Sequence, residues 1–344
     1  MSGFQNDAQD NGEAGLLKLD HITKVYSTGT FGGGQMTAVR DVSFEVKPGE
    51  VMSVIGESGS GKSTIGKMIL RLSPISNGTI SFDGTDVSTL KRRALKEYRR
   101  DVQGVFQDPF SSYNPIFKAD RVFAMVKNEF FPGTSGPEWR NKISLALEAV
   151  TLDPTQVLHK YPHQLSGGQL QRLLIARALL LDIRFLVADE IISMLDASTR
   201  IDVLNLLADL KGRGLGIMFI THDLSLGNYI SEKTVILRRG LIVEMGETQK
   251  VFGNPTHPYT KMLLASVPQI HRKWEEVAEE LKVSDTVVID KEAAAKKTYE
   301  TVSEILAPDA DDSVLVETEP EHLVRFSPEE AREMEPAAVA GKTE

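Results

Sequence analysis

The sequence predicts an α/β fold in which buried strands alternate with helices and a long helical insertion interrupts the alternation. Two apolar runs, at residues 51–55 and 185–190, have the length of buried strands, and helical patterns follow them at residues 64–72 and 198–211. Residues from about 110 to 180 lack regular strand signals and are predicted to be helical segments separated by loops. Strands that alternate with helices indicate an α/β architecture, and the helical stretch indicates an insertion within it.

The stretch between the first of these strands and its helix carries a specific chemical signal. Its sequence is Gly56-Glu57-Ser58-Gly59-Ser60-Gly61-Lys62-Ser63-Thr64, which fits the phosphate-loop pattern G-x-x-x-x-G-K-[ST]. The glycines allow successive N–H groups to point at one anion, Lys62 can reach β- and γ-phosphates, and the Ser63 hydroxyl can ligate Mg²⁺. An ordinary glycine-rich turn is the alternative. The strand before the loop and the helix after it, whose N-terminal dipole favours an anion, argue for the phosphate site.

Composition and charge exclude several classes of protein. The 344 residues suffice for one large or two modest domains, and 41% hydrophobic with 25% charged residues is typical of a globular protein. The absence of cysteine excludes disulfides, thiolate zinc sites and cysteine-bound iron–sulfur clusters. Residues 281–344 hold 16 acidic and 7 basic side chains, an excess equal to the net charge of −9, so residues 1–280 are neutral. A neutral body argues against a general nucleic-acid binder.

The hydropathy pattern predicts no membrane span. The longest apolar run, residues 173–188, is interrupted by Arg177, Asp182 and Arg184. Residues 1–15 are polar and acidic, unlike a signal peptide. Any role at a membrane is therefore expected to depend on a partner.

The N-terminal part is predicted to contain strands at residues 16–26, 39–46 and 77–84, with a glycine-rich loop at residues 29–36. Tyr26 ends the first of these strands, and two interpretations of it stay open. It is either an edge-strand packing residue or a ring that stacks on the base of a nucleotide.

A basic helix is predicted at residues 91–100, before a strand at residues 102–106 that ends in Gln107. A basic helix is compatible with nucleic-acid binding, but no aromatic residues are interleaved as a base-stacking platform needs. A solvated helix face is the favoured interpretation.

A second anion-binding pattern and a pair of carboxylates follow the insertion. Ser166-Gly167-Gly168-Gln169 opens a helix predicted at residues 170–181, and a serine before glycines at a helix start offers a hydroxyl cap and free N–H groups, although Ser-Gly-Gly is also a common linker. The strand at residues 185–190 ends in Asp189 and Glu190. In a phosphate-loop protein the first carboxylate holds the Mg²⁺ shell and the second takes a proton from water. An acidic pair at a helix N-terminus is the alternative.

Further strands complete the predicted sheet. An apolar strand at residues 217–221 ends at His222, on the edge where open α/β sheets bind ligands, although a histidine after a strand is more often structural. Residues 234–237 and 241–247 are predicted to close the sheet as a hairpin.

With these motifs in this order, residues 16–267 resemble the ATP-binding cassette (ABC) ATPases. The resemblance rests on the phosphate loop, Gln107, LSGGQ at 165–169, FLVADE at 185–190, the Leu195-Asp196 loop and His222. It implies a phosphate-loop nucleotidase fold with a RecA-like mixed-sheet core, an antiparallel β subdomain and a helical subdomain at about 110–180. Residues 268–327 would form a small C-terminal accessory segment, with a helix at 291–305 and a strand at 313–316. Residues 1–15 and 328–344 would be disordered tails.

Within that family the chain resembles the ATPases of oligopeptide and dipeptide importers, in particular the second of their two ATPase subunits. The resemblance rests on Phe106-Gln107-Asp108-Pro109 with Asn114-Pro115, and on Asn254-Pro255-Thr256-His257-Pro258-Tyr259-Thr260. It implies a heterodimer with a related ATPase, two integral-membrane permease subunits and an extracellular substrate-binding protein, with no direct contact to nucleic acid. It also implies a location on the cytoplasmic face of the membrane, held there by the permeases.

The resemblance assigns roles to residues of this chain, with ATP and Mg²⁺ as the bound groups. Tyr26 would stack on adenine, and the loop from Gly56 to Thr64, with Lys62, would grip phosphates. Metal binding would involve Ser63, Gln107 and Asp189, and catalysis would involve Glu190, His222 and Gln107. The signature residues Ser166, Gly167, Gly168 and Gln169 would act on the partner's nucleotide, and Asp196 would link the two sites.

Two departures from the family pattern leave alternatives open. Ile191 replaces the proline that usually follows the glutamate, which motivates a regulatory subunit with little turnover. The Ser193-to-Asp196 variant also resembles importers of oligosaccharides, so the cargo is expected to be a peptide or an oligosaccharide. A further alternative rests on the basic helix at 91–100 rather than on a departure from the family pattern. It is a soluble ABC ATPase that acts on nucleic acid or ribosomes.

Overall fold

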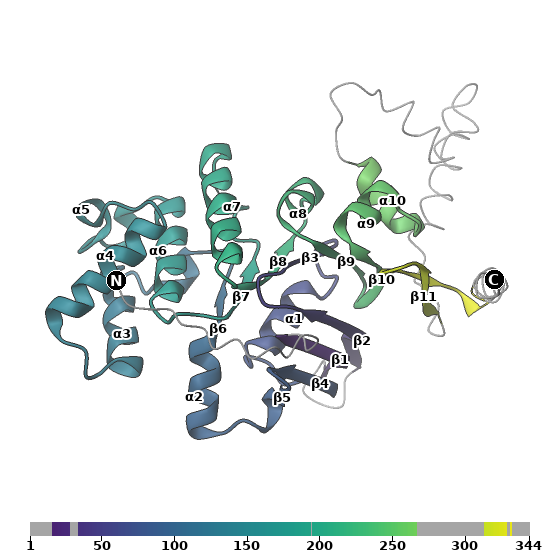
Figure 1. Ribbon diagram of the computed structural model, residues 1–344, viewed down its shortest axis with the longest axis horizontal. Coiled ribbons are helices and arrows are strands. Elements are labelled where there is room, and N and C mark those ends of the chain that lie inside the picture. The colour runs from purple at the N-terminus through teal and green to yellow at the C-terminus, as the bar shows by residue number, and fades with distance from the viewer. Residues whose placement is uncertain (1–15, 28–33, 194, 267–312, 329–330, 332–344) are drawn as a thin grey trace.

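The computed structural model describes residues 16–27, 34–193, 195–266, 313–328 and 331, and it confirms the predicted α/β architecture (Figure 1). Its strands are β1 Leu17–Ser27, β2 Gln35–Val46, β3 Val51–Ile55, β4 Asn77–Phe82, β5 Thr85–Asp86, β6 Val102–Val105, β7 Phe185–Asp189, β8 Gly216–Thr221, β9 Lys233–Arg238, β10 Leu241–Glu247, β11 Val314–Glu319 and β12 His322–Phe326. Its α-helices are α1 Lys62–Ile69, α2 Arg92–Asp101, α3 Arg121–Phe130, α4 Gly136–Ala149, α5 Pro154–Val157, α6 Gly167–Leu179, α7 Ala197–Gly212, α8 Leu224–Ile230, α9 Thr248–Gly253 and α10 Pro258–Ala265. Short 3₁₀ turns lie at Val87–Thr89, Phe110–Ser112 and Pro162–Gln164.

The larger sheet has the strand order β11-β12-β10-β9-β3-β8-β7-β6. Strands β9, β3, β8, β7 and β6 are mutually parallel, whereas β10, β12 and β11 pair antiparallel. Every residue of β3, β7 and β8 is buried. These strands are mostly apolar because other elements cover both faces of the parallel part of the sheet.

The smaller sheet has the order β2-β1-β4-β5 and is antiparallel throughout, which confirms the predicted antiparallel subdomain. Helix α1 packs between the two sheets (Figure 1). Its buried side chains Ile65, Met68 and Ile69 join one apolar cluster with residues of both sheets. This packing fixes the helix that begins immediately after the phosphate loop.

The stretch predicted as a helical insertion contains α3, α4, α5 and α6, which form a layer at one end of the molecule (Figure 1). Trp139, Leu147 and Leu170 are buried in a cluster that connects this layer to β6 and β7. Helix α6 begins at Gly167 rather than at the predicted residue 170, because Ser166 and Gln169 form a capping box. Helix α1 likewise begins at Lys62 and ends at Ile69, before the exposed Leu72.

The β9–β10 hairpin forms as predicted, with a two-residue turn in which Arg239 and Gly240 have φ of 46° and 86°. The expectation that this hairpin closes the sheet was wrong, because β12 pairs with β10 and β11 pairs with β12. The predicted strand at 313–316 is β11, and β12 was not predicted. The helix predicted at 291–305 and the tail at 1–15 lie outside the described residues, as does nearly all of the tail at 328–344.

Among the helices of the described residues, none combines the length and apolar character needed to cross a membrane.

Candidate active site

The phosphate loop connects β3 to α1, and two of its glycines are required by close backbone packing. A Cβ at Gly56 would lie 2.0 Å from the carbonyl oxygen of Leu237, and a Cβ at Gly61 would lie 2.5 Å from that of Ala38. Real Cβ atoms do not approach backbone oxygens this closely, and Gly61 also has a φ of 106°. The Gly240 N–H donates to the Ser60 carbonyl at 2.9 Å. The loop is therefore held from outside by the neighbouring hairpin and by β2.

Lys62 lies inside the loop rather than in solvent. Its Nζ donates to the carbonyl oxygens of Gly56 and Glu57, each at 2.7 Å. Burial lowers the pKa of Lys62, whereas the nearby carboxylates of Glu190, Asp189 and Glu57 raise it. The ammonium group thus lies inside the curve of the loop, near the carboxylates of Asp189 and Glu190 at the end of β7.

Ser63 and Asp189 form a hydroxyl–carboxylate pair beside the loop. The Ser63 Oγ donates to Asp189 Oδ1 at 3.1 Å, although the two residues are 126 positions apart. Burial raises the pKa of Asp189, and the hydrogen bond from Ser63 lowers it. A hydroxyl and a carboxylate are hard oxygen donors of the kind that bind Mg²⁺ together with substrate phosphates. The pair therefore fits a magnesium ion.

Glu190 and His222 extend from the ends of β7 and β8. The His222 Nδ1 lies 3.3 Å from Glu190 Oε1, and the His222 side chain is 61% exposed against 19% for Glu190. Glu190 has a φ of 50°, and its N–H donates to the Ile220 carbonyl at 2.9 Å. The left-handed backbone at Glu190 ends β7 in a sharp turn, which sequence reasoning did not predict. The parallel order β3-β8-β7 thus brings Lys62, Asp189, Glu190 and His222 to one sheet edge, as expected.

Tyr26 also lies near the loop. It stands near the end of β1, and hydrogen bonds with the Ser73 and Thr64 side chains lower its pKa. The Nζ of Lys24 lies 4.7 Å from the centroid of its ring. The structure therefore brings Tyr26 to the first turn of α1.

Gln107 follows β6 and is exposed. Because β6 is parallel to β7, its end lies at the same sheet edge, with Val105 opposite Ala188. The residue before Gln107 is held from α6, because the Gln171 side chain donates a hydrogen bond to the Phe106 carbonyl.

The signature residues lie apart from the phosphate loop, in the helical layer. The Ser166 Oγ accepts from the Gln169 N–H at 3.1 Å, and the Gln169 Oε1 accepts from the Ser166 N–H at 2.9 Å. A Cβ at Gly168 would lie 3.3 Å from the Thr199 side chain, which places the signature beside the start of α7. Gly167 lies at the same turn, near Phe110.

Asp196 caps α7 next to the signature. Its carboxylate accepts from the Thr199 N–H at 3.0 Å, from the Ser198 Oγ at 2.6 Å and from the Thr199 Oγ1 at 2.9 Å. These hydrogen bonds hold the pKa of Asp196 well below its usual range. Asp196 therefore stays charged near the signature residues.

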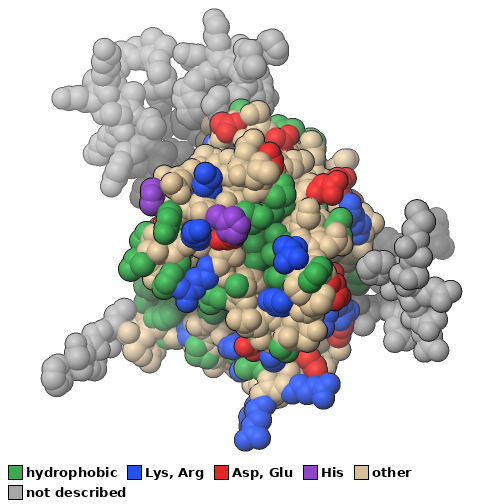
Figure 2. Space-filling model, turned by 90° about the vertical axis from the view of Figure 1, so that its left-hand side faces the viewer, with side chains coloured by type: hydrophobic (Ala, Val, Ile, Leu, Met, Phe, Trp, Pro, Cys, Tyr) green, Lys and Arg blue, Asp and Glu red, His purple; other side chains and the backbone are tan. Residues whose placement is uncertain are grey.

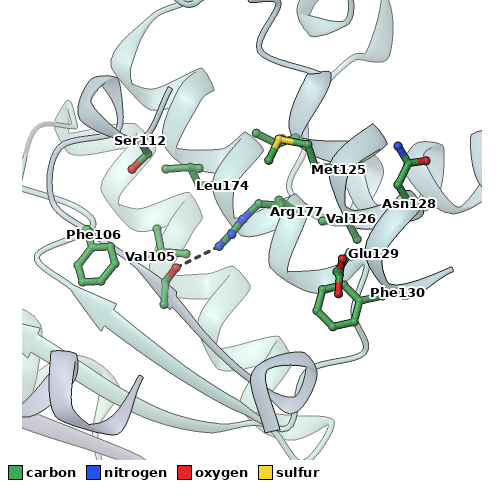
Figure 3. Close-up of a pocket in the computed structure, with 12 residues that line it drawn as sticks. Val105, Phe106, Ser112, Met125, Val126, Asn128, Glu129, Phe130, Leu174 and Arg177 are labelled. Carbon is green, nitrogen blue, oxygen red and sulfur yellow. Dashed lines mark hydrogen bonds between the residues drawn. The ribbon is translucent and has the colours of Figure 1, made fainter. Parts of the chain in front are cut away.

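A groove of about 730 Å³ opens between the end of β6 and helices α3 and α6. Figure 3 shows Arg177 between these elements, with a hydrogen bond of 3.1 Å to the Gly104 carbonyl. Figure 2 shows hydrophobic side chains gathered on the face of the molecule that carries the helical layer. Exposed apolar side chains of that layer and of the segment that leads into it include Phe110, Ile116, Phe117 and Met125. The groove was not predicted from the sequence.

Comparison with known proteins agrees with this geometry. The ABC transporter family model matches residues 39–193, and the model for the C-terminal region of oligopeptide/dipeptide transporters matches residues 243–291. The chain is 37% identical over 283 residues to the oligopeptide transport ATP-binding protein OppF of Bacillus subtilis, covering 79% of this chain and 92% of that protein. It is 36% identical over 325 residues to OppF of Streptococcus mutans, covering 92% and 96%.

Among solved structures, the fold is similar to the dimeric ATP-binding cassette MJ0796 bound to ADP and Pi. The TM-score is 0.62 at 30% sequence identity, over 68% of this chain and 99% of that one. The phosphate loop, the strand-end carboxylates and these relatives lead to one conclusion: the chain belongs to the ABC transporter family, as an ATP-binding subunit that hydrolyses ATP.

Proposed function

We propose that this chain powers an importer of oligopeptides or dipeptides, in which separate permease subunits cross the membrane. The observation that carries the proposal is the pairing of an intact ATPase site with the segment from Asn254 to Thr260. That segment lies within the match to the C-terminal region of oligopeptide/dipeptide transporters. The relatives named OppF are oligopeptide transport proteins, which supports a peptide cargo over an oligosaccharide.

Binding of ATP uses groups that already converge at the sheet edge. The N–H groups of the phosphate loop and the Lys62 ammonium neutralise phosphate charge, and the Tyr26 ring stacks on the adenine. The Ser63 hydroxyl and the Asp189 carboxylate, together with Gln107, hold Mg²⁺. When bound, the ion neutralises charge that develops on the transferred phosphoryl group.

Hydrolysis uses the carboxylate and imidazole that lie beyond the metal pair. Glu190 orients the attacking water and accepts its proton, and its position beside His222 keeps the carboxylate directed at the sheet edge. The exposed His222 ring contacts the γ-phosphate. Little covalent chemistry is required of the protein, because phosphoryl transfer is accelerated mainly by positioning and electrostatic stabilisation.

The unit of function is a pair of ATPases. Ser166, Gly167, Gly168 and Gln169 cap a helix in a layer apart from this chain's own phosphate loop, so they are free to act on a nucleotide held by another cassette. Asp196, charged and next to Gly168, links the two composite sites. A related, non-identical ATPase is the proposed partner, and the resulting sandwich closes on ATP binding and reopens after hydrolysis.

The groove beside α3 and α6 is the proposed docking site for a permease. It combines apolar side chains, of which Met125 is exposed, with the half-buried Arg177, and it adjoins the segment after β6 that carries Gln107. A permease segment bound in this groove would move with the helical layer when the two ATPases close on ATP. Docking there would hold the chain at the cytoplasmic face of the membrane, and an extracellular binding protein would deliver the cargo.

Transport by the assembled complex tests this proposal. The chain is reconstituted with its permeases, partner ATPase and binding protein in vesicles, and peptide uptake is measured with wild type and with Glu190→Gln. We expect the variant to retain ATP binding and lose uptake. Normal uptake by the variant would exclude this site as the driver of the cycle.

The alternative of a soluble ABC ATPase acting on nucleic acid or ribosomes rests on α2. Several of its basic side chains already have partners: Arg93 pairs with Glu97, Lys96 with Glu129, and Arg100 lies over the Phe131 ring. A partly neutralised face argues against phosphate binding. RNA co-purification together with release from membranes that contain the permeases would favour the alternative.

A second alternative, a subunit with little turnover, rests on Ile191. This side chain is buried in the core cluster beside Leu195. ATPase rates of the complex, measured with wild type and with Ile191→Pro, distinguish an active subunit from one with little turnover. A large gain in ATPase rate in the variant would show that Ile191 suppresses turnover.

A further inference from the structure

The backbone of the phosphate loop makes a long-range contact with a side chain that the ATPase mechanism does not use. The Glu57 N–H donates to the Tyr259 hydroxyl oxygen at 3.2 Å, across 202 positions of sequence. The carbonyl oxygen of the same residue accepts from Lys62 Nζ at 2.7 Å. One residue, Glu57, is thus held at its N–H by Tyr259 and at its carbonyl by the phosphate-binding lysine.

Tyr259 is built into the core rather than placed on the surface. It is 0% exposed, and the Arg238 guanidinium lies 5.1 Å from the centroid of its ring. Its backbone N–H donates to His257 Nδ1 at 3.1 Å, which fixes the first turn of α10. Burial raises the pKa of Tyr259, so the hydroxyl keeps its proton and remains neutral at physiological pH. A side chain held this firmly can position a loop.

A buried carboxylate determines where Tyr259 lies. Glu244 on β10 is 0% exposed, and its two oxygens accept the Thr256 N–H at 2.9 Å and the His257 N–H at 3.1 Å. These two residues directly precede α10. Because a buried carboxylate must be hydrogen-bonded, Glu244 fixes the turn from which Tyr259 projects.

The same carboxylate reaches the C-terminal hairpin. His322 Nε2 on β12 lies 2.8 Å from Glu244 Oε1, and His322 is also 0% exposed. Strands β10 and β12 pair with Gly246 opposite His322. A continuous series of contacts therefore runs from β12 through Glu244 and the turn before α10 to Tyr259 and Glu57.

We propose that Tyr259 is a positioning residue for the phosphate-binding loop and that Glu244 couples it to the C-terminal hairpin. The inference rests on the proposed ATP site, and it gives the segment from Asn254 to Thr260 a physical role. Its tyrosine orients the peptide group between Gly56 and Glu57, and the Gly56 carbonyl of that group accepts from the Lys62 ammonium. Tyr259 is fully buried, and the groups that it positions are the phosphate-binding backbone and Lys62, so its effect falls on binding rather than on the hydrolytic step.

ATP binding to the purified full chain tests the role of Tyr259. The dissociation constant for ATP with Mg²⁺ is measured by calorimetry for wild type, Tyr259→Phe and the control Tyr98→Phe. Tyr98 is a second buried tyrosine, whose hydroxyl donates to the Ile69 carbonyl at 2.5 Å, away from the loop. The loss of one neutral hydrogen bond predicts about fivefold weaker binding for Tyr259→Phe. Tyr98→Phe should bind ATP as wild type does.

The outcomes separate this inference from the proposed function. Failure of wild type to bind ATP would overturn the proposed site itself. If wild type binds and both variants bind within about twofold of it, the positioning role is wrong, since a hydrogen bond to a folded loop should exceed that change. In the assembled complex we expect Tyr259→Phe to raise KM and leave kcat unchanged. A loss in kcat with KM unchanged would also contradict the inference.

Hydrogen exchange on the wild-type chain covers the case in which Tyr259→Phe does not fold. We expect the Glu57 amide to exchange slowly, because it is bonded to a fully buried hydroxyl. Exchange of that amide at the rate of an unprotected peptide would show that the contact is absent in solution and would overturn the inference.

A double-variant experiment tests the part played by Glu244. Glu244→Gln replaces one accepting oxygen by an amide donor, and Glu247→Gln, an exposed carboxylate on the same strand, is the control. We expect Glu244→Gln to weaken ATP binding and Glu247→Gln to leave it unchanged. If Glu244 acts through Tyr259, adding Tyr259→Phe should cause less than the sum of the two losses. Full additivity, or no effect of Glu244→Gln, would rule out coupling along this route.

Discussion

The imidazole Nδ1 of His222 lies 3.3 Å from the Glu190 Oε1, at the ends of the adjacent strands β8 and β7. The backbone of Glu190 adopts a φ of 50°, which turns the chain away from the strand immediately after the buried Asp189. One carboxylate is thus directed toward Ser63 in the phosphate loop and the next toward the histidine. Two consecutive acidic residues acquire different neighbours, and hence different proposed roles, from this single turn.

Replacement of Glu190 by glutamine should abolish hydrolysis while preserving nucleotide binding. The amide cannot accept a proton from water, and general-base catalysis contributes about 10²- to 10⁴-fold, so the rate should fall by at least about 100-fold. Phosphate release and ATP affinity are measured on the same preparation. Glu148→Gln, an exposed position on α4, is the control and should leave both unchanged. A Glu190→Gln protein that hydrolyses ATP within about tenfold of wild type would contradict the assignment of the base.

Replacement of Ser63 by alanine should raise the Mg²⁺ concentration required for activity. The change removes both a proposed metal ligand and the hydrogen bond to Asp189 Oδ1. We expect the half-saturating Mg²⁺ concentration to rise by about tenfold or more, the scale on which loss of supporting groups weakens metal sites. Ser58→Ala, in the same loop, provides the control. Identical Mg²⁺ titrations of the two variants would argue against Ser63 as a ligand.

A charge placed in the groove should disrupt assembly with the permease. Met125 on α3 is 60% exposed and lines the groove, whereas Leu145 on α4 is 56% exposed and does not line it. Met125→Glu should prevent co-purification with permease-containing membranes without changing ATP affinity, because burial of an unpaired carboxylate against an apolar partner is costly. Leu145→Glu should behave as wild type. Equal membrane recovery of both variants would place the docking surface elsewhere.

Local patterns account for the parts of this site that the sequence predicts. The phosphate loop, the buried strands and the residues that end them produce short signals, and parallel pairing of β3, β8 and β7 then brings Lys62, Asp189, Glu190 and His222 together. The sequence does not decide between the two interpretations of Tyr26, because nothing in its local pattern shows that it lies beside Thr64. The left-handed backbone at Glu190 has no glycine to signal it.

Contacts between distant segments were not predictable in the same way. The hydrogen bond between Glu57 and Tyr259 spans 202 positions, and the contact between Glu244 and His322 spans 78. Neither pair follows from a helical or strand period. Strand β12 was missed for a related reason: its sequence His322–Phe326 mixes two basic side chains into five residues, and its burial depends on β10. Arg325 is accommodated because its Nε donates to the Ile242 carbonyl at 2.7 Å.

Asp196 should contribute stability that depends on pH. Its hydrogen bonds from Ser198 and Thr199 make the folded-state pKa lower than that of the unfolded chain. A depressed pKa means that the contribution is fully present above the unfolded value of about 3.9 and is lost as the pH falls toward the folded value. Asn also caps helices, so Asp196→Asn removes the charge and keeps the cap. We expect the Tm difference between wild type and the variant to be largest near neutral pH and to narrow below about pH 4. A difference that stays constant over this range would contradict the assignment.

Replacement of Gly246 by alanine should detach the C-terminal hairpin from the core sheet. A Cβ at this position would lie 2.3 Å from the backbone oxygen of Glu321, a contact that cannot be relieved by rotating a side chain. Strand β12 must therefore move away from β10, which weakens the contact between His322 and Glu244. Overpacking of this kind costs about 1–3 kcal/mol. Hydrogen exchange should show loss of protection in β12 before any loss in β3 or β8.

Gly253→Ala is the matched control for this change, because a Cβ there has open space. It should leave the exchange of β12 unchanged. If Gly246→Ala also leaves β12 protected, the hairpin is held by contacts other than its pairing with β10. If it releases β12 and weakens ATP binding together, the hairpin supports the phosphate loop through Glu244 and Tyr259. Release of β12 with unchanged ATP affinity would show that Tyr259 positions the phosphate loop without support from the C-terminal hairpin.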